Sequence, residues 1–260
     1  MNVILMSLIA GALGMGLGST VTAVLGKKTD SLISVLLAFA AGVMLSIVFI
    51  ELIPEAYEHS NMAVAVVGVA LGALLVIVLN KIVDKISEVG KVKLLFHGKF
   101  TEAAADGDIS LHNKKGMLRS GIIILIAITL HNIPEGLAMG AAGQHDISLG
   151  MRLAIMIALH NIPEGMAVAA PLIAGGLSKG LTAFLSIAAG ATTTIGAIIG
   201  MYIGGINELT LAFSFSIAGG AMLYIVFAEV LPQSIAASKG RGPAMFALIG
   251  AVVGLIITAI

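Results

Sequence analysis

The chain consists of eight long apolar runs separated by polar connections. A helix needs about 20 mostly apolar residues to cross the hydrocarbon core of a bilayer, and each run is about that long, although the last is slightly short. None of the runs alternates apolar and polar residues, as the strands of a membrane barrel would. The pattern predicts an all-α integral membrane protein with a single transmembrane domain over residues 1–260. Its eight transmembrane helices are expected at about Val3–Leu25, Leu32–Leu52, Met62–Asn80, Met117–Ala142, Leu149–Ala174, Gly180–Ile203, Leu209–Leu231 and Pro243–Ile260.

The composition excludes several classes of protein. Apolar residues make up 58% of the chain, charged residues only 11%, and the mean hydropathy is +1.09. These values are far from those of soluble domains. Basic and acidic residues balance at 14 each, so no basic surface is expected to bind nucleic acid. The chain has no Cys, which excludes disulfides, thiolate metal sites and thiol catalysis.

The basic residues predict the orientation of the helices, because they gather in cytoplasmic connections. One set of connections holds 13 of the 14 Lys and Arg residues, and Arg152 alone falls in the other set. Both termini should then face outward, and the long connection at about 81–116 should be cytoplasmic. The first run is followed by Lys27 and Lys28, whereas a secretory signal has its positive charge in front. We therefore expect a retained first helix in a multi-pass protein of the cell membrane, either inner or plasma membrane.

The connections also carry histidines and acidic residues whose role the sequence leaves open. His97 and His112 in the long connection could hold metal weakly or belong to a solvated linker. The outward connections are short and acidic, with His59 and His145 among them. They could concentrate cations at a mouth, or they could be solvated turns.

One seven-residue motif, Leu-His-Asn-Ile-Pro-Glu-Gly, occurs twice, at residues 130–136 and 159–165. In each copy His and Glu are four positions apart, so they lie on one face of a helix with Asn one position along. One helix and a short outward turn separate the copies, so the two helices should be adjacent and antiparallel with the motifs at similar depth. The residues expected to converge are His131, Asn132, Glu135, His160, Asn161 and Glu164.

A proline stands inside each copy of the motif. Pro134 and Pro163 lack the N–H that would bond the carbonyls of Leu130 and Leu159. In lipid, a freed carbonyl must be satisfied by protein or face a polar cavity. We expect two kinked helices beside a cavity lined by the motif residues.

The motif residues are predicted to bind a divalent cation. A carboxylate inside a membrane helix must be paired or neutralised, yet neither helix interior offers a Lys or Arg beside its motif. Imidazole nitrogen together with carboxylate and amide oxygen suits Zn²⁺, and also Fe²⁺, Mn²⁺, Co²⁺ or Cd²⁺, whereas Ca²⁺ and Mg²⁺ prefer oxygen alone. A shared carboxylate could bridge two ions, so a binuclear site is geometrically feasible.

With these motifs on its fourth and fifth helices, the chain resembles the ZIP (Zrt/Irt-like) metal transporters, in particular their bacterial branch. The helix count, the outward termini and the long cytoplasmic connection after the third helix also agree. The resemblance implies a divalent transition-metal transporter, with zinc as its first candidate substrate and no enzymatic activity. Metal would move from outside into the cytoplasm by alternating access of a central binuclear site.

The resemblance also assigns individual residues. It places His131, Glu135, His160 and Glu164 at the first metal position, and the two Asn with the same two Glu at the second. Met44 on the second helix matches a thioether ligand of the first metal, although an apolar Met in a membrane helix commonly only packs. Glu229 matches an acidic residue of the seventh helix near the cytoplasmic exit. Glu51, near the outer end of the second helix, is a candidate for the entrance.

The sequence departs from the family pattern at the sixth helix. Many members carry a Glu there that completes the second metal position, but here Thr193 stands at that place. A hydroxyl is a weak neutral ligand, so the second position should carry less negative charge and hold metal less tightly. Whether the site takes one ion or two is left open.

Two other classes of function use the same ligands. A membrane di-metal carboxylate enzyme would need a Glu with a His three residues after it, together with further Glu residues. In this chain the His comes first, four residues before the Glu. A passive metal channel or a metal sensor would need no more than the ligands present. The sequence is compatible with a homodimer in the lipid bilayer but does not establish one.

Overall fold

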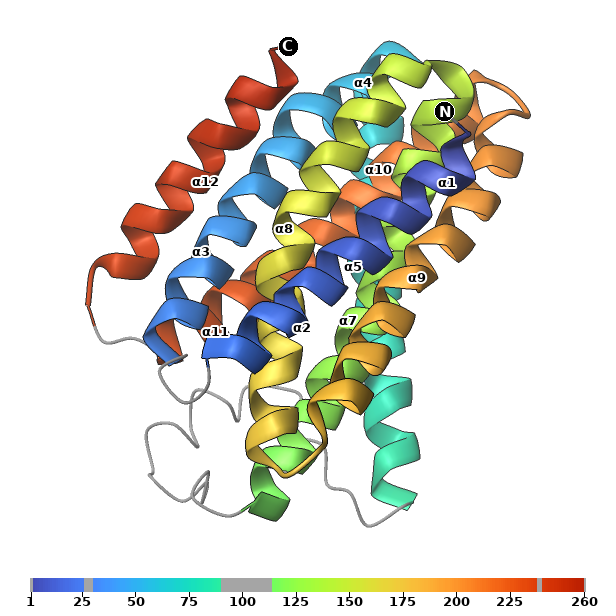
Figure 1. Cartoon of the computed structure of the whole chain (residues 1–260). Coiled ribbons are helices and arrows are strands. Elements are labelled where there is room, and N and C mark those ends of the chain that lie inside the picture. The colour runs from blue at the N-terminus through green and yellow to red at the C-terminus, as the bar shows by residue number, and fades with distance from the viewer. Residues whose placement is uncertain (1, 26–29, 90–113, 238–239, 260) are drawn as a thin grey trace.

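The computed structural model describes residues 2–25, 30–89, 114–237 and 240–259. Within these ranges the chain is helical apart from short turns, and the helices form one elongated bundle (Figure 1). The helical segments in chain order are α1 (Val3–Leu8), η1 (Ile9–Leu13), α2 (Gly14–Leu25), α3 (Asp30–Ser46), η2 (Ile47–Leu52), α4 (Ile53–Glu58), α5 (Met62–Val89), α7 (Lys114–His145), α8 (Ile147–Ala174), α9 (Lys179–Gly204), α10 (Glu208–Ile225), η3 (Val226–Val230), α11 (Leu231–Ala237) and α12 (Gly242–Thr258).

The all-α membrane fold with eight apolar helices is confirmed. Among the residues that the structure describes, seven continuous helices are long and apolar enough to cross a membrane, and α12 is a shorter apolar helix of 17 residues. Several helices extend past the predicted spans, as α5 does in passing Asn80 to reach Val89. An apolar run marks only the part of a helix that lies in lipid, whereas backbone hydrogen bonding continues into the polar residues that follow. His97 and His112 lie outside the described residues.

Three of the spans contain a π-helical segment that the sequence did not predict. These are η1, η2 and η3, and the last two contain Glu51 and Glu229. Both acidic residues are followed three positions later by a proline, Pro54 or Pro232. The missing proline N–H leaves the carbonyl four residues earlier without its helical partner, and this disturbs the regular ladder at each segment. Such π-bulges are frequent at functional sites.

The helices pack as two groups. The first, which we call the ligand bundle, consists of α1, η1, α2, α7, α8 and α9, and the second, the flanking bundle, consists of the remaining segments. Within each bundle, glycines allow backbones to touch: a methyl group on Gly136 would overlap the Thr193 carbonyl, and one on Gly42 would overlap the Ala247 carbonyl. Between the bundles, α3 packs on α8 and α10 packs on α7. Apolar side chains fill the core that they share, so the two bundles meet largely through side chains.

An internal repeat relates α3 and η2 to α10 and η3. Residues 40–54 and 218–232 are identical at nine positions, including both Met, both acidic residues and both prolines named above. Their close contacts repeat too, because Gly42 lies against the Ala247 carbonyl of α12 and Gly220 lies against the Val69 carbonyl of α5. Figure 1 shows that α3 and α10 run in opposite directions, so the repeat is inverted, an arrangement common in transporters.

The same two-fold relation extends to the ligand bundle. The amide of Asn132 on α7 donates to the Ala189 carbonyl of α9 at 2.9 Å, and the amide of Asn161 on α8 donates to the Ala10 carbonyl of η1 at 3.4 Å. The next residues, Gly190 and Gly11, lie against each other's carbonyl groups. The pseudo-two-fold axis therefore passes between α7 and α8, where the two motif copies face each other.

Candidate metal site

The structure brings the two copies of the motif together in the middle of the ligand bundle. Pro134 and Pro163 lie inside α7 and α8, and both helices continue through them. The predicted ligands on each helix are almost completely buried, with at most 3% of any residue exposed, as the structure shows for His131, Asn132, Glu135, His160, Asn161 and Glu164.

Two histidines and two carboxylates form the centre of the site. Nε2 of His131 lies 3.0 Å from Oε1 of Glu135 and 3.3 Å from Oε1 of Glu164. Nε2 of His160 lies 2.6 Å from the same Oε1 of Glu135. One ligand atom from each of the four residues falls within 4.8 Å of the others, which is compact enough for a single metal ion. Glu135 is the residue that contacts both imidazoles.

A backbone contact fixes the orientation of one histidine. Nδ1 of His160 lies 3.0 Å from the carbonyl oxygen of Met156, one turn earlier on α8. A carbonyl can only accept, so Nδ1 carries the proton and Nε2 presents its lone pair to the site. This arrangement, with the second nitrogen held by an outer partner, is typical of metal-binding histidines.

No Lys or Arg in the described part of the chain neutralises the carboxylates of the site. Neither Glu135 nor Glu164 forms an ion pair with Lys or Arg among the described residues. Several of the acceptors are buried without a hydrogen-bond partner, namely Oε2 of Glu135 and both carboxylate oxygens of Glu164. Buried charges are normally paired or coordinate metals, so the donor set fits a divalent cation.

The amide half of the site consists of neutral oxygens. Asn132 and Asn161 use their NH₂ groups on backbone carbonyls, so each presents an unpartnered Oδ1. Thr193 on α9 is fully buried with its hydroxyl also unpartnered, and its carbonyl lies against Gly136, next to Glu135 in the chain. The place of the helix-six carboxylate is thus occupied by a buried, unpartnered hydroxyl, which faces Gly11 of η1.

The two remaining predicted residues have different positions. Met44 is fully buried on α3 in the apolar core, and its role as a ligand stays a prediction. Glu229 of η3 borders a small cavity of about 20 Å³ together with His131 and Glu164. The acidic residue expected near the exit is therefore adjacent to the metal ligands.

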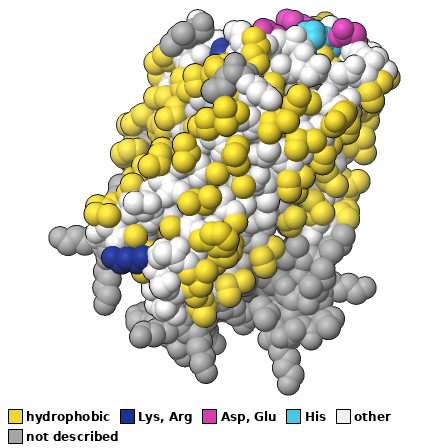
Figure 2. Space-filling view, turned by 45° about the vertical axis from the view of Figure 1, so that its right-hand side comes forward, with side chains coloured by type: hydrophobic (Ala, Val, Ile, Leu, Met, Phe, Trp, Pro, Cys, Tyr) yellow, Lys and Arg dark blue, Asp and Glu magenta, His cyan; other side chains and the backbone are white. Residues whose placement is uncertain are grey.

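A second group of polar residues lies at the end of the molecule that carries both termini, which we call the terminal end (Figure 1). Figure 2 shows acidic and histidine side chains gathered there. The His59 ring lies 3.4 Å from the Glu55 carboxylate and also contacts the Glu208 carboxylate. It packs edge-on against the ring of His145. His59 directly follows α4, and its partners come from α4, α10 and α7, so their chain positions gave no indication of the contact.

The sequence analysis also missed an ion pair between distant helices. Nε of Arg152 on α8 lies 3.1 Å from Oε1 of Glu51 in η2. Since 101 positions separate the two residues, only the folded structure could reveal the pair.

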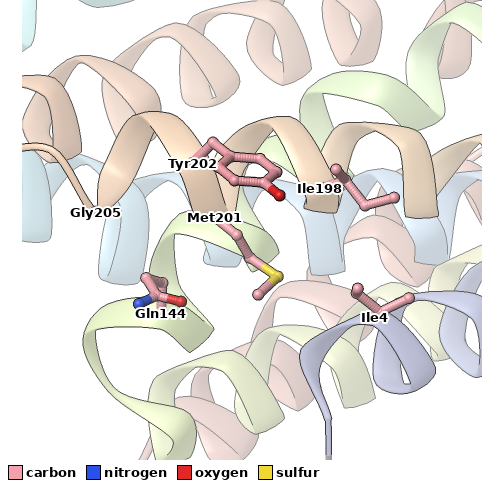
Figure 3. A pocket seen from close by; sticks show the side chains of 6 residues that line it. All are labelled: Ile4, Gln144, Ile198, Met201, Tyr202 and Gly205. Atoms are coloured by element: carbon pink, nitrogen blue, oxygen red, sulfur yellow. The ribbon is translucent and has the colours of Figure 1, made fainter.

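One surface hollow lies away from the site. It has a volume of about 540 Å³ and lies between α1, the end of α7 and the end of α9 (Figure 3). Its lining is uncharged, and Tyr202 at its rim is 78% exposed. None of the candidate ligands borders it.

Comparison with known proteins identifies the family. The family model described as ZIP Zinc transporter matches residues 1–115 and 97–260. The zinc transporter ZupT of Chlorobium chlorochromatii is 30% identical over 265 residues, which cover 98% of this chain and 94% of the relative. ZupT of Akkermansia muciniphila is 32% identical, with 99% and 95% covered, and the zinc transporter GufA of Myxococcus xanthus is 42% identical over 44% of this chain and 46% of its own. The chain belongs to the ZIP family of zinc transporters, a family of transporters and not of enzymes.

Proposed function

We propose that this protein carries Zn²⁺ across the cell membrane through the buried site between α7 and α8. The observation that carries the proposal is the cluster of His131, Glu135, His160 and Glu164, whose ligand atoms lie within 4.8 Å of one another. Two carboxylates and two imidazoles match the ligands that zinc prefers. The zinc transporters with which the chain aligns along nearly its whole length support zinc as the substrate.

The distribution of basic residues supports a direction of transport. We propose that the terminal end faces outward, because 13 of the 14 basic residues fall in connections at the opposite end of the sequence-predicted helices. The acidic residues of the terminal end would then concentrate cations at the outer mouth (Figure 2). Glu229, beside the cavity below the site, would receive the ion on its way to the cytoplasm.

The ligands divide into a strong and a weak position. The first position combines His131, His160 and the two carboxylates, with Met44 as a further ligand. The second shares the carboxylates with the amide oxygens of Asn132 and Asn161. Because Thr193 adds no charge, the second position binds metal more weakly than the first. Fe²⁺, Mn²⁺, Co²⁺ and Cd²⁺ are competing substrates that the same ligands accommodate.

Flux into liposomes tests the proposal. Purified protein is reconstituted into liposomes that contain a zinc-sensitive dye, and influx is recorded over a range of external zinc concentrations. We expect influx that saturates with zinc and exceeds that of empty liposomes. Zinc binding to the purified protein without any influx would favour a metal sensor and contradict transport.

Thiol accessibility distinguishes a carrier from a channel. The chain has no Cys, so a single introduced Cys can be labelled from either side without background. In an alternating-access carrier, a Cys at Ile128, which borders the cavity below the site, is reached from one side at a time. Simultaneous access from both sides in the presence of zinc would indicate an open channel.

A substitution at Thr193 should strengthen the second position. We expect Thr193→Glu to add a bound zinc ion, or to tighten the weaker one, because it supplies the sixth-helix carboxylate that completes the second metal position in many family members. Calorimetry of the purified protein measures both stoichiometry and affinity. Thr192→Glu is the matched control, since the Thr192 hydroxyl bonds the carbonyls of Thr129 and Ala189 and does not stand at the helix-six carboxylate position. Equal zinc binding by both variants would contradict the assignment.

A further inference from the structure

The ion pair between Glu51 and Arg152 lies between the terminal end and the metal site. We propose that Glu51 is an entrance site for the divalent cation and that Arg152 is its resident counter-cation, which the arriving metal replaces. This inference rests on the proposed function. It adds the basic residue that holds the entrance carboxylate before the metal arrives, which the family resemblance does not supply.

The pair joins the two bundles through a guanidinium and a carboxylate. Arg152 belongs to α8 of the ligand bundle, and Glu51 belongs to η2 of the flanking bundle. The Glu51 side chain is 7% exposed and that of Arg152 is 27% exposed. A guanidinium nitrogen of Arg152 also bonds the Ser148 hydroxyl at 3.2 Å, which gives the side chain a second partner towards the surface.

The depth of the pair places it on the route to the site. Arg152 precedes His160 by eight residues on α8, which corresponds to about 12 Å along the helix. Glu55 follows Glu51 by four residues, so it lies about one turn nearer the surface, where it contacts His59. A cation that enters from the acidic terminal end therefore reaches Glu51 before it reaches the metal ligands.

The internal repeat assigns the role of Glu51. Its counterpart is Glu229, and the two residues occupy the same position in the two π-helical segments. The cavity on the far side of the metal site is lined by Leu37, Ile128, His131, Glu164, Ile225 and Glu229. Under the repeat, the corresponding residues on the near side are Phe215, Ile157, His160, Glu135, Ile47 and Glu51, and each of them is buried. The near-side counterpart of the cavity is therefore lined by buried side chains, and Arg152 binds its carboxylate.

Electrostatics explain why the two cations exchange. A buried carboxylate that loses its partner is strongly destabilised unless another cation takes that place. When the bundles move apart on the near side, Glu51 separates from Arg152 and requires a new cation. A divalent metal from the acidic mouth supplies it, and Arg152 returns to Glu51 once the metal has moved to the central site.

Flux measurements on three variants test this exchange. In Arg152→Gln, zinc no longer competes with a guanidinium, so we expect the half-saturating zinc concentration to fall. In Glu51→Gln the entrance ligand is lost, so we expect that concentration to rise about tenfold. The double variant should behave as Glu51→Gln does. Arg241→Gln, a change at an exposed basic residue, serves as the control.

A purely structural ion pair gives a different result. In that case the two single variants would shift zinc half-saturation in the same direction, and the double variant would restore the original value. Either observation would overturn the proposal. Thermal unfolding of each purified variant shows whether a change in flux reflects loss of folded protein.

A labelling experiment remains informative even if the protein carries no zinc. Leu153 on α8 is fully buried, and its counterpart under the repeat, Ile124, borders the far-side cavity. We expect Leu153→Cys in intact cells to react slowly with a membrane-impermeant thiol reagent, and to react faster when Arg152→Gln is added. Asn61→Cys, in an exposed turn at the terminal end, is the positive control. Equal labelling rates with and without Arg152 would show that the pair does not close the near side.

Discussion

Replacing Glu135 by glutamine should reduce zinc influx to the level of empty liposomes. Glu135 contacts both histidines, at 3.0 Å and 2.6 Å, whereas Glu164 contacts only His131. Glutamine has nearly the same shape but no charge, so the variant removes half of the negative charge of the site and one ligand from both positions. Loss of an outer partner of a metal ligand already costs 10–100-fold in affinity, so loss of this shared ligand should cost more than about a hundredfold.

Zinc affinity by calorimetry and zinc influx into liposomes together measure this effect. Glu164→Gln should weaken binding by a smaller factor, because this carboxylate contacts one imidazole only. Glu58→Gln, the same chemical change at an exposed residue of the terminal end, should leave the zinc affinity measured by calorimetry unchanged. Influx by Glu135→Gln at the unsubstituted rate would mean that metal does not pass through this site.

The fold and the centre of the site could be predicted because each depends on local periodicity. Runs of about 20 apolar residues defined the eight helices, and a spacing of four residues placed His131 on the same helix face as Glu135. The exact copy of the motif then fixed which two helices face each other. A short turn, here reduced to Asp146 between α7 and α8, left the chain no other antiparallel arrangement of these neighbours.

The contacts that could not be predicted join residues far apart in the chain. Neither the pair between Arg152 and Glu51 nor the contact between His59 and Glu208 follows from any periodic pattern. Both depend on how the flanking bundle is placed against the ligand bundle. The inverted repeat would have provided a partial indication, because the identical residues around Glu51 and Glu229 are visible in the sequence alone.

The repeat also explains why the two asparagines of the site are held by equivalent hydrogen bonds. Asn132 and Asn161 each donate to a carbonyl of the helix that crosses behind them, and the two acceptors, Ala189 and Ala10, are equivalent under the two-fold relation. The residues that follow the acceptors are the glycines whose backbones touch. The crossing of η1 and α9 therefore sets the direction in which both amide oxygens point.

This crossing leads to the second large effect that we expect. Gly190→Ala should destabilise the protein and weaken zinc binding, because the added methyl would overlap the Gly11 carbonyl, a backbone atom that no side-chain rotation can move. Overpacking of this kind costs about 1–3 kcal/mol, which corresponds to a fall of about 2–12 °C in the unfolding midpoint of a domain of this size. The forced separation of η1 and α9 also shifts the Ala189 carbonyl away from Asn132.

Thermal unfolding in detergent and zinc calorimetry on the same preparation separate the two consequences. Gly180→Ala is the matched control, since Gly180 lies near the start of the same helix and a methyl there meets no atom within 4 Å. Gly11→Ala, the equivalent change across the two-fold axis, should reproduce the effect of Gly190→Ala, because its methyl would overlap the Gly190 carbonyl. If only one of the two glycine variants weakened zinc binding, the two halves of the site would not be held by equivalent contacts, and the inverted repeat would not extend to the metal ligands.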